Sequence, residues 1–300
     1  MKHKYLLALS AAMLVATATT FAQGKIDFEE NHTQYPAQVK YKVGIGSGIT
    51  MFMEQNRFTY VKYDPAQLEQ IHDASHQAEN HDTRKEGVVN LHSFRMTFVG
   101  ANPNALVSAV GARPYYTNYY LGNDPAKWSS NVASYTEVFY SGLYSGVNLT
   151  AYSVNDQFKY DFIVAPNADP SQIQMRFDHT DGLLIQNNTL IIKLSTGDIV
   201  EQVPYTYQVI NNVKYPVACE YVLSADGKTV SFRFPNGYNQ NYPLTIDPVL
   251  VAATYSGAPS STTTYGHCAT YDPSGNIYTG GECFNAGYPT QAGSYQTSFG

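Results

Sequence analysis

The sequence is poor in charged residues, and this absence narrows the partners that it can have. Only 14% of the residues are Asp, Glu, Lys or Arg, and the formal net charge is −6 at pH 7. No stretch gathers Lys and Arg into a basic patch. Because proteins bind nucleic acids largely by neutralising phosphates with positive charge, we expect no nucleic-acid partner.

Cysteine, tryptophan and long apolar runs are scarce as well. The three cysteines are too few for a disulfide framework, and Trp128 is the one tryptophan. Past the N-terminus, no segment approaches the roughly 18 apolar residues that a membrane helix requires, so we expect no integral membrane span. Tyrosine, in contrast, is abundant: the 26 Tyr and 14 Phe are typical of exported β proteins with hydrogen-bonding surfaces.

Residues 1–22 have the pattern of a secretory signal peptide. Lys2 and Lys4 form a charged start, an apolar core runs from Tyr5 to Ala18, and Thr20 to Ala22 offers a cleavage site with small residues. The alternative is a buried N-terminal helix. We expect export and cleavage near Ala22, which places the mature chain outside the cell or on its outer surface.

Residues 23–248 predict one β-rich domain. Alternation of apolar and polar residues predicts hairpins over 49–63 and 147–164 and a single strand over 92–99. From Ile173 to Phe234, short strand patterns (one of them over 217–223) recur between turn signals such as Asn187-Asn188 and Asn211-Asn212. This spacing predicts an all-β fold that is β-sandwich-like or barrel-like. A short helix is expected only over 66–77.

Residues 249–300 predict the start of a β-propeller. Tyr265 to Tyr271 and Ile277 to Gly281 read as two strands around a tight turn, and a second unit begins at Tyr288. A propeller blade contains four strands, and a propeller contains several blades. We therefore expect an incomplete blade and a longer natural protein.

A set of short strings, in a fixed order, supports this domain order. The strings are Phe28 to Asn31 with Gln34, Phe58 to Tyr60, Leu121 to Pro125 with Trp128, Tyr160 to Pro166, Ala168 to Pro170, Glu201 to Pro204, and Pro243 to Pro248. On these strings, residues 27–249 resemble the uncharacterised β-rich domain that precedes propeller repeats in many secreted proteins of Bacteroidetes-type bacteria. Residues 254–300 resemble the SBBP-type propeller repeat.

The resemblance implies a large secreted or surface protein with adhesion-like domains and a C-terminal signal for type IX secretion. Thr33 departs from the family pattern, which usually has glycine there. Cys268 and Cys283 also depart from it, because ordinary strand residues are expected at both positions.

Three aromatic residues are candidates for ligand contact. Trp128 follows a loop, and Tyr119 and Tyr120 lie near it in the sequence. Aromatic side chains in such a setting can stack on a sugar ring. Core packing is the favoured alternative for Trp128.

The cysteines and histidines give weaker signals. Cys268 and Cys283 lie on the two strands of the C-terminal hairpin about three residues out of step, so a disulfide needs a bulge or a loop excursion. Cys219 is expected to pack as a small buried apolar group. His72 and His76 have the i, i+4 spacing of metal ligands, but a solvated polar loop explains them better than a metal site.

No pattern of catalytic residues is present. Glu29 and Glu30 are neighbours on a strand and therefore point to opposite faces. Asp161, a charge inside an apolar strand, is expected to pair with Arg or to cap a turn. We predict no catalytic residue, no cofactor and no metal.

These observations favour an exported, non-enzymatic scaffold whose loops contact polysaccharide or another surface protein. The alternative is the N-terminal part of a secreted hydrolase with its catalytic residues beyond Gly300.

Overall fold

The computed structural model describes residues 26–46, 48–64, 67, 88–120, 123–154, 157–248, 250–251, 264–271 and 277–283. Residues 25–255 form one compact unit, and the hairpin of β20 (Thr264–Tyr271) and β21 (Ile277–Cys283) belongs to a second. The signal peptide, all but residue 67 of the helix expected over 66–77, and the histidines at 72 and 76 lie outside the described residues.

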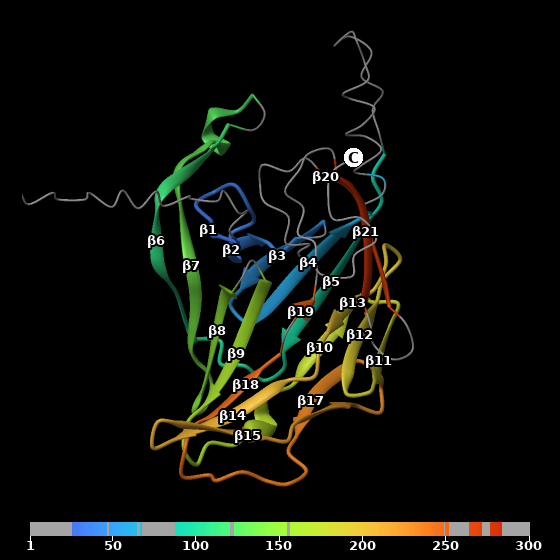
Figure 1. Ribbon diagram of the computed structural model, residues 1–300. Coiled ribbons are helices and arrows are strands. Elements are labelled where there is room, and N and C mark those ends of the chain that lie inside the picture. Colours follow the sequence, from blue (N-terminus) through green and yellow to red (C-terminus); the bar gives the residue numbers. More distant parts are fainter. Residues whose placement is uncertain are drawn as a thin grey trace, which may run out of the picture. The chain divides into compact units, whose positions relative to one another are not determined.

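The large sheet of the first unit is organised around one long strand, β7 (Ser129–Tyr144), which β6 (Leu106–Tyr119) covers along one side. Tyr135 of β7 pairs with Ala112 of β6 and with Phe28 of β1 (Phe28–Glu30), so β1 lies on the side opposite β6. Val138 pairs with Ala109 of β6 and with Ala151 of β8 (Val147–Val154), so β8 lies on that same side. The sheet therefore divides at β7 into two wings (Figure 1).

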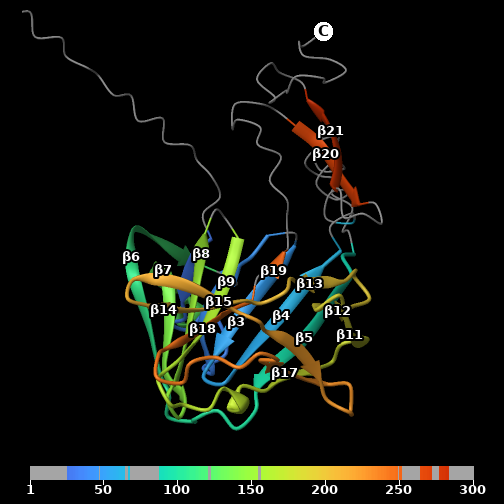
Figure 2. The ribbon, with the colours of Figure 1, turned by 60° about the horizontal axis from the view of Figure 1, so that its bottom comes forward.

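All strand pairs in the two wings are antiparallel. The first wing runs from β7 through β8, β9 (Gln157–Val164), β18 (Leu244–Asp247), β14 (Tyr205–Ile210) and β15 (Val213–Val217). The second runs through β1, β2 (Val39–Gly44), β3 (Ile49–Glu54), β4 (Arg57–Tyr63), β5 (Leu91–Phe98), β10 (Met175–Asp178), β17 (Thr229–Arg233) and β16 (Glu220–Leu223). Figure 2 shows the two wings from a second direction.

A smaller sheet completes the unit. It consists of β11 (Gly182–Gln186), β12 (Thr189–Lys193), β13 (Ile199–Glu201) and β19 (Leu250–Val251). Leu190, Ile192 and Ile199 of this sheet are buried in the same hydrophobic cluster as the inner faces of both wings. Two single-turn 3-10 helices, η2 (Pro125–Lys127) and η3 (Pro170–Gln172), lie in connections.

The two wings face each other across an aromatic core. The ring of Phe58, on β4, lies 6.3 Å from that of Tyr160, on β9 of the opposite wing, and 6.0 Å from that of Tyr140, on β7. Phe98 and Phe162 make a further contact between the wings, with ring centroids 6.0 Å apart. All five side chains are almost completely buried. The arrangement is sandwich-like, but its two layers are halves of one sheet.

The structure confirms the all-β class and the hairpins predicted over 49–63 and 147–164. The positive φ angles expected at the turns are present at Asn187, Asn188, Asn211 and Asn212. The single strand predicted over 217–223 is wrong. β15 ends at Val217 and β16 begins at Glu220, because the chain crosses there from the first wing to the second.

Within the described residues no closed barrel and no propeller is present, and the propeller start stays a prediction. In the β20–β21 hairpin, Cys268 pairs with Gly280 and Cys283 with Thr264. The register thus sets the two cysteines three positions apart and contains a bulge between Tyr265 and Cys268. The disulfide stays a prediction. Cys219 is buried as expected, and this burial raises the pKa of its thiol to about 11.

A carboxyl group lies inside the core. Glu201, at the end of β13, is only 1% exposed, and the Tyr160 hydroxyl is 3.0 Å from one of its oxygens. The Tyr221 hydroxyl lies 3.4 Å from the same oxygen. No cation is paired with Glu201 among the described residues, and burial raises its pKa to about 7. The protein therefore folds most readily when the Glu201 side chain is protonated and neutral.

Replacing Phe58 by Ala should lower the free energy of unfolding by about 3–5 kcal/mol, because it empties the contact between the wings. Urea denaturation would measure the loss. Leu106→Ala is the control: Leu106 is 67% exposed, and its loss should cost less than about 0.5 kcal/mol. Equal effects of the two substitutions would contradict the placement of the core.

Stability should fall as pH rises from about 4.5 to about 7, because over this range the folded chain keeps the Glu201 proton that the unfolded chain loses. The Glu201 contribution is at most about 3 kcal/mol and is absent above the folded pKa. Urea denaturation of wild type and Glu201→Gln at pH 5 and pH 8 measures it. The neutral amide should shrink the difference between the two pH values, and an unchanged difference would contradict this assignment.

Candidate functional site

The β6–β7 ribbon extends past the ends of β1 and β2 (Figure 1). Several of its aromatic side chains are exposed. Tyr116, Tyr120 and Trp128 are 60%, 57% and 40% exposed. The rings of Tyr120 and Trp128 lie 5.4 Å apart, edge to face, and the Ser130 hydroxyl donates to that of Tyr120 at 3.3 Å. The arrangement combines apolar ring surface with hydroxyl groups at its border.

Local hydrogen bonds position Trp128 at this place. The Asp124 side chain accepts from the backbone N–H of Ala126 at the start of η2, and Pro125 begins that turn. The Trp128 N–H then donates to the Pro125 carbonyl at 3.1 Å. Core packing, the alternative that the sequence favoured for Trp128, is wrong, because the side chain is 40% exposed.

Tyr119 points to the other face of the ribbon and serves as an anchor. Its hydroxyl donates to Glu29 and accepts from the Tyr35 hydroxyl at 3.2 Å. Burial, followed by these hydrogen bonds, raises the pKa of Tyr119. Lys42 lies 3.0 Å from the same Glu29 carboxylate. Tyr119 therefore holds the ribbon against β1 and β2, whereas Tyr120 and Trp128 face outward.

A second anchor lies further along the ribbon. The Arg113 side chain is 2.7 Å from Asp27, and the Tyr115 hydroxyl donates to the same carboxylate. The hydrogen bond from Tyr115 to Asp27 raises the pKa of this tyrosine. One carboxylate on β1, that of Glu29, and one just before it, that of Asp27, thus fix the ribbon at two points.

The loop from Asn31 to Pro36 lies against the end of β6 and the start of β7, and two amide side chains shape it. Asn31 donates to the carbonyls of Tyr35, Pro36 and Val39, and it accepts from the Tyr35 N–H. Gln34 accepts from the N–H groups of His32 and Thr33. The Thr33 hydroxyl lies 2.6 Å from that of Ser129, which adds a contact between the loop and β7.

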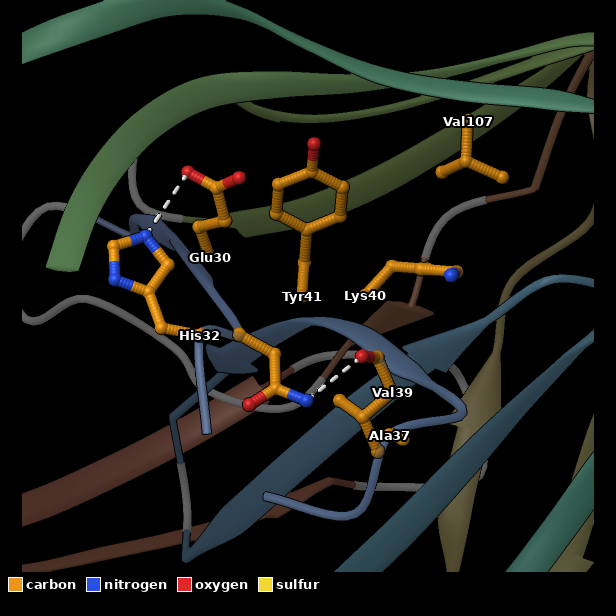
Figure 3. A pocket seen from close by; sticks show the side chains of 8 residues that line it. Glu30, His32, Ala37, Val39, Lys40, Tyr41 and Val107 are labelled. Atoms are coloured by element: carbon orange, nitrogen blue, oxygen red, sulfur yellow. Dashed lines mark hydrogen bonds and ion pairs between the residues drawn. The ribbon is translucent and has the colours of Figure 1, made fainter. Parts of the chain in front are cut away.

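A polar pocket of about 370 Å³ opens on the other side of this loop (Figure 3). Glu30 and Tyr41 point into it from β1 and β2, and His32, Lys40 and Val107 contribute to its walls. The Tyr135 hydroxyl donates to Glu30 at 3.3 Å, and His32 lies 3.7 Å from the same carboxylate. Burial, with the charge of Glu30 next, raises the pKa of Tyr41 to about 12.

The pocket offers donors and acceptors together. The carboxylate of Glu30 disfavours anions, and the ammonium group of Lys40 disfavours cations. A neutral ligand with several hydroxyl groups can donate to the Glu30 carboxylate and accept from the Lys40 ammonium group. The volume lies in the range of roughly 300–1,000 Å³ that small-molecule sites occupy.

Glu29 and Glu30 point to opposite faces as the sequence predicted. Asp161 pairs with no arginine among the described residues, and its contacts are with Tyr152 and Asp247. In the part of the chain that the structure describes, no group of three or more potential metal ligands occurs. No helix there is long and apolar enough to cross a membrane.

Sequence reasoning missed Tyr116, Glu30 and Tyr41 as site residues. Tyr116 had a signal, because it lies in the tyrosine-rich stretch before Trp128. Glu30 and Tyr41 had none, because only the β1–β2 register places them opposite each other.

The fold and this surface define an all-β domain in which one large antiparallel sheet carries an exposed aromatic ribbon beside a polar pocket. The chain belongs to the family described as a domain of unknown function, DUF7948, which matches residues 28–249. No curated protein and no solved structure matches the chain.

Trp128, the only tryptophan, should fluoresce from a solvent-exposed environment. Acrylamide should quench its emission clearly in the native chain, though less than in the urea-unfolded chain, because the side chain is 40% exposed. Tyr120→Ala should increase native quenching further, because it removes the ring that covers one edge of the indole. A blue-shifted emission that resists quenching would contradict the exposure of Trp128.

Proposed function

We propose that the chain is an exported, non-enzymatic scaffold whose β-rich domain binds polysaccharide through the outer face of the β6–β7 ribbon. The exposed Tyr120–Trp128 pair is the observation that carries this proposal. The C–H face of a sugar ring is apolar and packs on aromatic rings, while its hydroxyl groups bond to polar atoms at the ring border. Tyr116 and Ser130 extend the surface in this way.

The anchoring of the ribbon supports a binding role. Tyr119 and Arg113 tie the inner face to Glu29 and Asp27, so the outer aromatic residues are presented on a rigid element. A rigid surface loses little conformational entropy when a ligand binds. The polar pocket next to the Asn31–Pro36 loop is suited to one further sugar unit of the bound polysaccharide.

The remaining parts of the proposal rest on the sequence pattern. Residues 1–22 direct export to the outside of the cell or its surface. Residues 249–300 begin an SBBP-type propeller, and the whole protein is a type IX-secreted surface protein of a Bacteroidetes-type bacterium. In this arrangement the β-rich domain binds polysaccharide and leads into the propeller.

Binding to a panel of soluble glucans, xylans, mannans and chitin oligosaccharides tests the proposal by affinity electrophoresis and by Trp128 fluorescence. At least one polysaccharide should retard the chain and change the emission. Trp128→Ala and Tyr120→Ala should each weaken that binding about tenfold or more, as loss of a central aromatic contact does.

Tyr215→Ala is the matched control, because Tyr215 is 49% exposed on β15, in the first wing. It should leave the affinity unchanged. Failure of every polysaccharide to bind, or equal weakening by the control, would refute the assignment of the ribbon.

A further inference from the structure

Two aspartates oppose each other on neighbouring strands of the first wing. β9 and β18 are antiparallel, with Ile246 opposite Phe162, and the next pair in this register is Asp247 opposite Asp161. Phe162 and Ile246 are buried in the core, so the two carboxyl groups lie together on the outer face. Asp247 is nevertheless only 6% exposed.

The surrounding groups leave this pair one hydrogen short. The Tyr152 hydroxyl, from β8, lies 3.2 and 3.1 Å from the two oxygens of Asp161, but a hydroxyl donates one hydrogen only. Lys159, from β9, is 2.6 Å from Oδ2 of Asp247. Oδ1 of Asp247 is buried and has no partner. A buried acceptor without a donor is costly.

Among the residues that the structure describes, no further cation compensates the second carboxylate. From β14, Tyr205 pairs with Asp247 in the register, and Tyr207 lies near Tyr152. Lys214, from β15, is held 4.1 Å above the Tyr207 ring. The charge of Asp247 also contributes to the raised pKa of Tyr221, on β16. One ammonium group, that of Lys159, therefore stands against two carboxyl groups.

We propose that Asp161 and Asp247 share one proton and that this proton is a pH-sensitive clasp between β9 and β18. A hydrogen on Asp161 donates to Oδ1 of Asp247, which satisfies the orphaned oxygen and removes the like-charge contact. Burial, and next the charge of Asp247, raise the pKa of Asp161 to about 7, in agreement with this geometry. The proton is present in weak acid and leaves as the pH rises past neutral.

The position of the pair makes its ionisation consequential. In the strand order β15-β14-β18-β9, β18 alone joins the β14–β15 hairpin to the rest of the large sheet among the described strands (Figure 1). Asp247 is also the last residue of β18, from which the chain continues to β19 of the second sheet. Two negative charges at this point loosen both the hairpin and the exit of the chain.

Hydrogen–deuterium exchange of the full chain at pH 5.5 and pH 8.0, corrected for intrinsic rates, tests the clasp. The protection factors of amides in β18 and β14 should fall about thirtyfold from pH 5.5 to pH 8.0. The reason is that Asp161 holds its proton far more tightly when β9 and β18 are paired than when they are open. Asp161→Asn should abolish this dependence and keep the protection high, because its amide donates to Asp247 at any pH.

Two controls separate the clasp from other titrations. For amides that exchange by local opening of β18, Asp178→Asn, on β10 of the second wing, and Glu201→Gln, on β13, should both keep the wild-type ratio. Wild-type protection that does not change with pH would overturn the proposal. So would a ratio that survives in Asp161→Asn but vanishes in Glu201→Gln.

A second measurement covers the case in which Asp161→Asn does not fold. Carboxyl ¹³C NMR of the wild type should show Asp161 titrating near pH 7, and Asp247→Asn should lower that midpoint towards the ordinary aspartate range. A wild-type midpoint near 4 would overturn the shared proton.

Discussion

The whole domain depends on one constraint: strand β7 has β6 along one side and two different strands, β1 and β8, in succession along the other. A sheet cannot stay flat when one strand is followed by two neighbours on the same side, so it splits there into wings. The apolar faces of the wings then cover each other, and Phe58, Tyr140 and Tyr160 meet between them. The β6–β7 ribbon continues beyond this contact.

Tyrosine hydroxyls satisfy carboxyl groups throughout this structure. The hydroxyls of Tyr160 and Tyr221 donate to Glu201 in the core, and that of Tyr152 donates to Asp161 on the outer face. The Tyr119 hydroxyl donates to Glu29 in the same way. A phenol donates a hydrogen without adding charge, so buried acids with phenol partners favour the protonated form more than acids paired with Lys or Arg do.

Hairpins whose strands alternate cleanly were predictable. The pattern over 147–164 works because Phe158, Tyr160 and Phe162 all face the core and the residues between them do not. β6 and β7 were missed for the opposite reason. β6 has bulges between Ala112 and Tyr116 and again after Thr117, and each bulge shifts the alternation by changing which residues face inward. The aromatic residues of the candidate site lie on these two strands, so their roles were only partly predictable.

The sequence by itself determined the all-β class and the asparagine turns, because both depend on residues that are neighbours in the chain. The tertiary structure alone decided that Trp128 faces solvent, that Glu30 and Tyr41 line one pocket, and that Asp161 lies against Asp247. Each of these outcomes depends on which strand lies next to another. Local periodicity shows that one face of a strand is buried, but it does not identify the strand beside it. That neighbour is selected by packing between residues far apart in the chain.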